Sequence, residues 1–278
     1  MKASTRLAQR LREPGMVVAP GCHDALGARI IEQAGFGAVY MTGNGLSASL
    51  LGAPDIGLLT LTEMVARGRA IAQAIEVPLI ADADTGYGNL NNVQRTIREY
   101  EAAGVAAVHL EDQVTPKKCG AMNGLALVSA EEHADKIRAA IAARSSEDFL
   151  IIGRSDARLP NGFADALKRG QLYAEAGADL VLLEMLQSEA EMREAIASID
   201  APLVFNFVEH KVPPLSVAQF EALGFKLLNY PVASTLAYAR MMRDFAQAIA
   251  RDGTTLGSAP AQLALHDYEQ ILGLNAYH

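Results

Sequence analysis

The chain has 278 residues, half of them hydrophobic and a fifth charged, so it can bury the core of one barrel-sized domain or of two smaller domains. Its formal net charge of −8 argues against nucleic acid or an anionic membrane as the main partner, and no apolar run is long enough to span a bilayer. Two cysteines cannot form a disulfide framework, and the polar segment 1–12 lacks the apolar core of a signal peptide, so we expect a cytoplasmic protein.

Short apolar segments recur along the chain, and each is followed by a stretch with helical character. They are 16–19, 38–41, 78–81, 107–110, 149–153, 180–183, 202–205 and 227–230. Four of them follow a glycine that is expected to end a helix, because glycine adopts the left-handed conformation cheaply. Apolar strands that alternate with helices predict a parallel sheet, and eight units predict a (β/α)8 TIM barrel. A doubly wound open sheet is the alternative.

The end of the chain is helical throughout. Helices are expected over 234–251 and near 259–272, and they exceed what eight barrel units require. We therefore expect one domain over residues 1–278, whose last part, 234–278, is a C-terminal helical extension.

Acidic residues collect where the predicted strands end, which is the catalytic face of a barrel. Asp82 and Asp84 follow the third strand and, two positions apart, would project to one side. Glu111 ends the fourth strand, Glu184 the sixth, and Arg154 is a nearby cation at the end of the fifth. Like charges held together need a cation, and oxygen ligands suit Mg²⁺ or Mn²⁺. Salt-bridged strand ends are the alternative, which four such carboxylates at once disfavour.

Other strand ends carry polar groups as well. The turn Thr42-Gly43-Asn44-Gly45 can offer backbone N–H groups to a carboxylate, or it is a plain strand-to-helix turn. His109 shares a face with Glu111, and Asn206 ends the seventh strand with Glu209 just beyond.

A long polar loop follows the fourth strand. It places Lys117 and Lys118 directly before Cys119, with Gly120 and Gly124 as possible hinges. Neighbouring positive charge predicts a lowered thiol pKa, although a cysteine in a mobile loop is often incidental. We expect Cys22 to be a packing residue and His133 to lie on a solvated helix face.

Several of these segments together resemble the isocitrate lyase/phosphoenolpyruvate mutase superfamily. The segments are 82–89 (DADTGYGN), 111–113 (EDQ), 116–120 (PKKCG), 47–49 (SAS), 54–57 (PDIG) and 154–158 (RSDAR). The resemblance covers roughly residues 15 to 235, and the Lys-Lys-Cys-Gly loop is similar to the lyase branch, which includes 2-methylisocitrate and 2,3-dimethylmalate lyases. It implies a barrel whose last helices are swapped between the subunits of a homotetramer.

The resemblance also implies a role for each candidate residue. The metal would be held by Asp84, with Asp82, Asp55 and Glu111 acting through water. The implied catalytic residues are Cys119, Lys117, Glu111 and Arg154. The implied substrate-binding residues are Tyr40, Thr42, Gly43, Asn44, Asp82, His109, Lys118, Gly120, Arg154, Glu184, Asn206 and Glu209. The implied reaction is Mg²⁺-dependent cleavage of a 2-hydroxy di- or tricarboxylate into a 2-oxo acid and a second carboxylate, with Cys119 on a gating loop transferring a proton.

The gating loop departs from the family's pattern at Ala121, where the lyases carry histidine. This keeps other reactions open: hydrolysis or decarboxylation of oxaloacetate, phosphonate processing, or a catalytically impaired dicarboxylate binder. Retention of Cys119 argues against the phosphonate branch.

Overall fold

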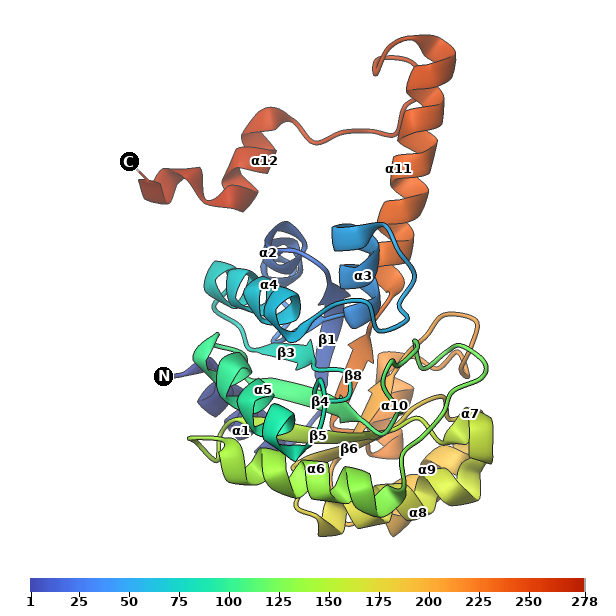
Figure 1. Ribbon diagram of the computed structural model, residues 1–278. Helices are drawn as coiled ribbons and strands as arrows, with labels where there is room; N and C mark the ends of the chain where they lie inside the picture. Colours follow the sequence, from blue (N-terminus) through green and yellow to red (C-terminus); the bar gives the residue numbers. More distant parts are fainter. Residues whose placement is uncertain (278) are drawn as a thin grey trace.

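The computed structural model describes residues 1–277 as eight parallel strands that close into a barrel in the order β1 to β8 (Figure 1). The strands are β1 (Val17–Cys22), β2 (Val39–Met41), β3 (Leu79–Asp82), β4 (Ala107–Glu111), β5 (Leu150–Ser155), β6 (Leu180–Leu183), β7 (Leu203–Asn206) and β8 (Leu227–Tyr230). β1 pairs with β8 from Val17–Leu227 to Pro20–Tyr230, which closes the sheet. The (β/α)8 prediction is confirmed, and the open-sheet alternative is wrong.

Helices follow the strands around the barrel. They are α1 (Ala3–Arg12), α2 (Ala25–Gln33), α3 (Gly43–Leu51), α4 (Leu61–Ala74), α5 (Leu90–Ala102), α6 (Ala130–Ala143), α7 (Arg158–Asn161), α8 (Phe163–Glu175), α9 (Glu189–Ser198), α10 (Val217–Leu223), α11 (Ala233–Asp252) and α12 (Leu265–Leu272), with a 3₁₀ turn η1 (Leu274–Tyr277). The glycines predicted to end helices, Gly35, Gly104, Gly177 and Gly224, have φ angles between 88° and 114°, as a left-handed cap requires.

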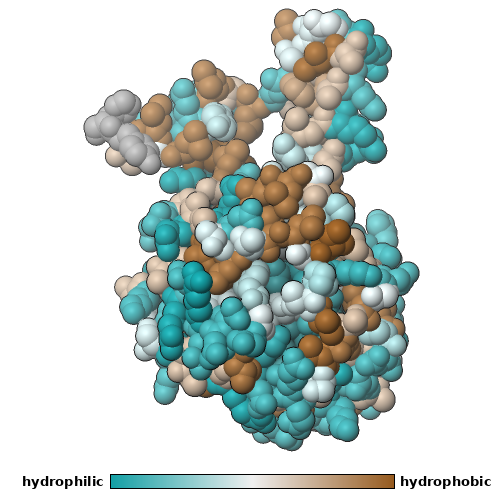
Figure 2. Space-filling model, viewed as in Figure 1, coloured by the Kyte–Doolittle hydropathy of each residue, from teal (hydrophilic) through white to brown (hydrophobic). Residues whose placement is uncertain are grey.

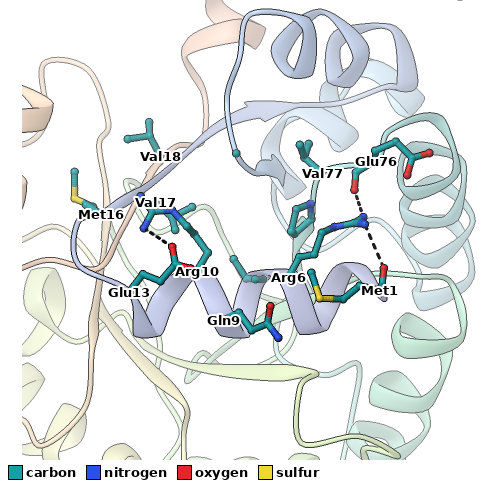
Figure 3. A pocket seen from close by; sticks show the side chains of 13 residues that line it. Met1, Arg6, Gln9, Arg10, Glu13, Met16, Val17, Val18, Glu76 and Val77 are labelled. Carbon is teal, nitrogen blue, oxygen red and sulfur yellow. Dashed lines mark hydrogen bonds and ion pairs between the residues drawn. The ribbon is translucent and has the colours of Figure 1, made fainter.

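α1 closes the end of the barrel at which the strands begin. Its Leu7 and Ala8 are buried against the strand starts, together with Val17 and Leu227. A cavity of about 530 Å³ lies beside this helix, where the Arg6 guanidinium donates to the backbone oxygens of Met1 and Glu76 (Figure 3). Every predicted site residue lies elsewhere, so this end of the barrel has a structural role.

The C-terminal arm, α11 to η1, leaves the barrel. α11 projects from the barrel and α12 comes back beside α2, where Gln33 Nε2 donates to Ile271 O at 3.3 Å (Figure 1). The expected helix over 234–251 is confirmed. The expected helix near 259–272 begins only at Leu265, because Ala259 precedes Pro260 and a residue before proline avoids the helical conformation. Residue 278, the end of the expected extension, lies outside the described residues.

No helix within residues 1–277 combines the length and the apolar character that crossing a membrane demands.

His133 is fully buried against Tyr173, with ring centroids 4.6 Å apart, so its predicted position on a solvated face is wrong. Burial lowers its pKa to about 3, which keeps the ring neutral.

Candidate active site

The Lys117 ammonium lies among carboxylates at the end of the barrel where the strands end. Its Nζ is 2.8 Å from Asp55 Oδ1 and 2.8 Å from Asp84 Oδ1, and all three side chains are buried. Burial alone would lower the lysine pKa, but Asp84, Glu111 and Asp82 together raise it well above its usual value. Lys117 therefore stays charged and partly balances the acidic cluster.

Asp82 and Asp84 are arranged differently from a simple extended strand. β3 ends at Asp82, and Asp84 has a φ of 47°, in a turn where its N–H donates to Asp82 Oδ1 at 3.1 Å. Burial raises the pKa of Asp84 to about 6, with help from Asp82 and Asp55. Burial also opposes the ionisation of Asp82, but Lys117 and Arg154 outweigh it and lower the pKa of that carboxyl. The pair thus holds one firmly ionised and one weakly acidic carboxyl.

The oxygen donors here fit a hydrated divalent metal. Among the described residues, Asp84 Oδ1 and both Glu111 carboxylate oxygens are buried without a hydrogen-bond donor, so the contact of Asp84 with Lys117 is an ion pair that lacks hydrogen-bond geometry. Within residues 1–277, no three His, Cys, Asp or Glu side chains are grouped closely enough to hold a metal directly. Mg²⁺ commonly uses one or two carboxylates and keeps several waters. The donors therefore fit a water-rich Mg²⁺ site and not a closed cage of side chains.

Arg154 is held by carboxylates on several sides. Its Nε lies 2.8 Å from Asp156 Oδ1 and 3.6 Å from Glu184 Oε2, and its Nη1 lies 3.3 Å from Glu111 Oε2. Burial raises the pKa of Glu184 to about 7 and that of Glu111 well above its usual value. Asn206 Nδ2 donates to Glu184 Oε2 at 2.8 Å. The guanidinium is thus fixed in one orientation beside the cavity.

Uncharged buried side chains on the strands contact the charged residues of the site. Asn229 Nδ2, on β8, donates to Asn206 Oδ1 at 3.0 Å and lies 3.5 Å from His109 Nε2. The His109 ring packs on Tyr40 with centroids 5.1 Å apart, and burial lowers its pKa to about 3. Asn229 was missed by sequence reasoning, although it stands at a strand end as Asn206 does.

Most predicted site residues line one cavity at the C-terminal ends of the strands. They are Tyr40, Thr42, Asn44, Asp55, Asp82, Lys117, Cys119, Gly120, Arg154, Glu184 and Asn206. Asp84 and Glu111 touch this lining through Lys117 and Arg154, and Gly43 lies against Asp82, where a Cβ would come 2.7 Å from a carboxylate oxygen. The remaining wall is apolar and consists of Ala121, Val208, Pro231 and Val232.

Four predicted substrate-binding residues lie outside this lining: Gly43, His109, Lys118 and Glu209. Lys118 turns its Nζ to Gly124 O, 3.2 Å away on the exposed side of the loop. Glu209, beyond β7, is partly buried near Tyr230. Burial raises the pKa of Tyr230, and the charge of Glu209 raises it further.

The Cys119 thiol differs from its sequence-based prediction. Its burial raises the pKa, and Arg154 and Lys117 lower it by less. The prediction of a lowered pKa is therefore wrong, since sequence neighbours do not show how deeply the thiol is buried. A thiol that keeps its proton is suited to act as an acid. Cys22 is buried with a pKa of about 12, as expected of a packing residue.

A buried polar network behind Arg154 was also missed. Asp112 accepts hydrogen bonds from Ser155 Oγ at 2.9 Å, Asp156 N at 2.8 Å, Tyr173 OH at 2.7 Å and Arg169 Nη1 at 3.1 Å. The sequence held one signal for this network. Successive side chains of a strand point to opposite faces, so Asp112 points away from Glu111 and towards the helices. This network positions Asp156, and through it Arg154.

Replacing Asp112 by alanine is expected to destabilise the protein by about 3–5 kcal/mol, because Arg169 and Tyr173 lose a buried acceptor. The measurement is chemical denaturation followed by circular dichroism. Asp135→Ala is the control: it removes an exposed partner of Arg138 and should cost about 0–1 kcal/mol. A loss below about 1 kcal/mol for Asp112→Ala would contradict its central position in the network.

Comparisons with known proteins show the family to which the chain is related. The family model described as phosphoenolpyruvate phosphomutase matches residues 7–250. A 2,3-dimethylmalate lyase from Eubacterium barkeri is 48% identical over 275 residues, which cover 99% of this chain and 95% of the relative.

Two solved structures share the fold over nearly the whole chain. Oxaloacetate acetylhydrolase in complex with 3,3-difluorooxalacetate superimposes with a TM-score of 0.93 and 32% identity, over 99% of this chain and 95% of the other. Phosphonopyruvate hydrolase in complex with oxalate and Mg²⁺ does so with a TM-score of 0.90 and 34% identity, over 100% and 97%.

Proposed function

The chain belongs to the phosphoenolpyruvate mutase/isocitrate lyase superfamily, and we propose that it is a Mg²⁺-dependent carbon–carbon lyase that cleaves a methyl-substituted 2-hydroxy dicarboxylate into a 2-oxo acid and a second carboxylate. The observation that carries this proposal is that the Cys119 thiol, the Arg154 guanidinium and the acidic cluster around Lys117 meet at one cavity. The 48% identity to a 2,3-dimethylmalate lyase supports it.

The side chains at the cavity can be assigned to the needs of this reaction. Arg154 would bind a substrate carboxylate, with Tyr40 and the turn after β2 enclosing the 2-oxo-acid part. Glu111 is the proposed acceptor of the hydroxyl proton, because burial raises its pKa and makes its ionised form a stronger base. Cys119 would donate its proton to the enolate-like fragment, and the closed loop excludes competing water.

The divalent ion fits the same cluster. We propose Asp84 as the direct ligand, with Asp55, Asp82 and Glu111 holding metal-bound waters. When bound, Mg²⁺ would supply positive charge for the oxygens of the 2-hydroxy acid and its 2-oxo product.

The cavity wall favours a dicarboxylate over a tricarboxylate. Among the described residues, Lys117 and Arg154 are the basic groups in the lining, and both already face carboxylates. The apolar part of the wall, with Ala121 and Val208, offers no partner for a third carboxylate but suits methyl groups. Ala121 thus suits a substrate whose substituents are small and apolar.

We expect the purified protein with Mg²⁺ to release a 2-oxo acid from methyl-substituted malates, measured by a coupled dehydrogenase assay. Cys119→Ala should lower kcat by about 10²–10⁴-fold, because it removes the proton donor. Cys22→Ala, a change at a buried packing residue, should keep the activity. Release of oxalate from oxaloacetate without any lyase turnover would contradict the proposal in favour of a hydrolase, and the absence of both activities would favour a dicarboxylate binder.

Mg²⁺ should stabilise the protein more at pH 8 than at pH 5. The pKa of Asp84 is raised to about 6, so its proton competes with the metal below that pH. Without metal, the folded state keeps this proton while the unfolded chain loses it near pH 4, so Asp84 lowers stability as the pH rises from about 4 to 6. At a hundredfold excess over Kd, the metal should add about 2.7 kcal/mol. Thermal unfolding with and without Mg²⁺ measures this effect.

The metal experiment has matched controls. Asp84→Asn should abolish the Mg²⁺-dependent shift, whereas Asp135→Asn, at an exposed position on α6, should leave it intact. An equal shift at pH 5 and pH 8, or a full shift in Asp84→Asn, would contradict the assignment of Asp84 as the metal ligand.

We further propose a homotetramer in which the C-terminal arm packs on a partner subunit. The arm carries exposed apolar side chains, with Leu256 93%, Leu265 71% and Leu236 55% exposed, and Figure 2 shows hydrophobic residues gathered there and on the adjoining barrel surface.

Analytical sedimentation should show a tetramer, and the double change Leu236→Glu with Leu265→Glu should weaken it. The neighbouring polar change His266→Glu should leave it intact. A monomeric wild-type protein would contradict this assembly.

A further inference from the structure

The two ends of the loop between β4 and α6 are paired with each other. The Val114 N–H donates to Ala126 O at 2.8 Å, Gln113 forms a bridge with Leu127, and the Val128 N–H donates to Asp112 O at 3.0 Å. We call the residues between these paired ends, 115–125, the lid.

This lid closes the cavity. Lys117 and Cys119 belong to it, and the Cys119 N–H donates at 2.9 Å to the backbone oxygen of Asp55, in the segment between α3 and α4. Gly120 packs so closely on Arg154 that a Cβ there would collide with the guanidinium. Arg154 itself is only 5% exposed. A carboxylate that binds Arg154 therefore requires the lid to move aside.

The Gln113 side chain joins the lid to the barrel. Its Nε2 donates to Lys118 O at 2.8 Å, and its Oε1 accepts from the Lys118 N–H at 2.9 Å. The same Nε2 also contacts Asp156 Oδ2. Gln113 is buried and is not part of the cavity lining, so its amide serves the lid and not a ligand.

Asp156 connects this contact to Arg154. Its carboxylate accepts from Arg154 Nε at 2.8 Å and from Arg154 Nη2 at 3.3 Å. One carboxylate thus holds both the amide that fixes the lid and the guanidinium that faces the cavity. An amide suits this place because it donates and accepts at once, whereas a carboxylate would repel Asp156 and a cationic side chain would offer no acceptor to the Lys118 N–H.

We propose that Gln113 is a positioning residue that latches the lid closed and couples its closure, through Asp156, to the orientation of Arg154. The latch follows from the contacts of the lid alone, and its effect on turnover rests on the proposed function, in which Arg154 binds a substrate carboxylate. Losing the latch raises the population of the open lid, so a ligand must first restore the closed state and its apparent affinity falls.

The test is the rate at which iodoacetamide labels Cys119 in the ligand-free protein, followed by peptide mass spectrometry. Gln113→Glu places a carboxylate beside Asp156 and cannot donate to Lys118 O, so labelling should accelerate by about tenfold or more. Trypsin cleavage after Lys117 or Lys118 should accelerate in parallel. Gln113→Met removes the hydrogen bonds without adding charge and should give a smaller increase.

Two further variants separate latching from general loosening. Gln171→Glu makes the same chemical change on α8, where the amide donates only to Ser198 O at 3.3 Å, and should leave labelling unchanged. In Gln113→Glu with Asp156→Asn, an amide at 156 can donate to the new carboxylate, so labelling should return towards the wild-type rate.

Labelling and cleavage do not require turnover, so they test the latch even if the lyase reaction is disproved. In an active enzyme, Gln113→Met should also raise KM more than it lowers kcat. Labelling of both Gln113 variants within twofold of wild type would overturn the proposal. So would global unfolding of Gln113→Met, because the side chain would then be supporting the barrel and not the lid.

Discussion

The active-site end of this molecule depends on how buried charge is balanced. Barrel closure brings Asp82, Glu111 and Glu184 together from separate strands, and only Lys117 and Arg154 face them as cations among the described residues that line the cavity. Burial raises the pKa values of Asp84, Glu111 and Glu184, and repulsion from neighbouring carboxylates adds to this, so the positive charge at the site falls short of what full ionisation requires. A further cation, supplied by a metal, would relieve the same shortfall.

Much of this arrangement could be predicted from local pattern. Apolar runs located all eight strands, because strands that are buried on both faces need no information from distant residues. Acidic residues at the ends of those runs indicated the mouth, since parallel strands end on one side of a barrel. The family resemblance added Asp55, which no pattern placed near the mouth, and the structure puts it against Lys117 across 62 positions of sequence.

What could not be predicted depends on burial and on distant partners. Two lysines beside Cys119 suggested a thiol with a lowered pKa. However, Lys118 points to solvent, and burial of the Cys119 thiol raises its pKa. His133 belongs to an amphipathic helix whose covered face includes it, which its neighbours in sequence do not show. Asp112 and Gln113 were visible only as part of a family motif. Their partners at Asp156 and Arg169 lie more than forty positions away, so their positioning roles emerge only from the fold.

The paired ends of the lid separate sequence changes within the lid from sequence changes in the barrel. Hydrogen bonds between 112–114 and 126–128 pair the two ends of the segment with each other, just after β4 and just before α6. Substitutions at exposed positions within 115–125, such as Asn123, can then accumulate with little effect on the scaffold, whereas Lys117 is held by buried carboxylates of the barrel mouth. In evolutionary terms the lid is a module on which new specificities can be selected, and a residue such as Ala121 can vary independently of the barrel that carries it.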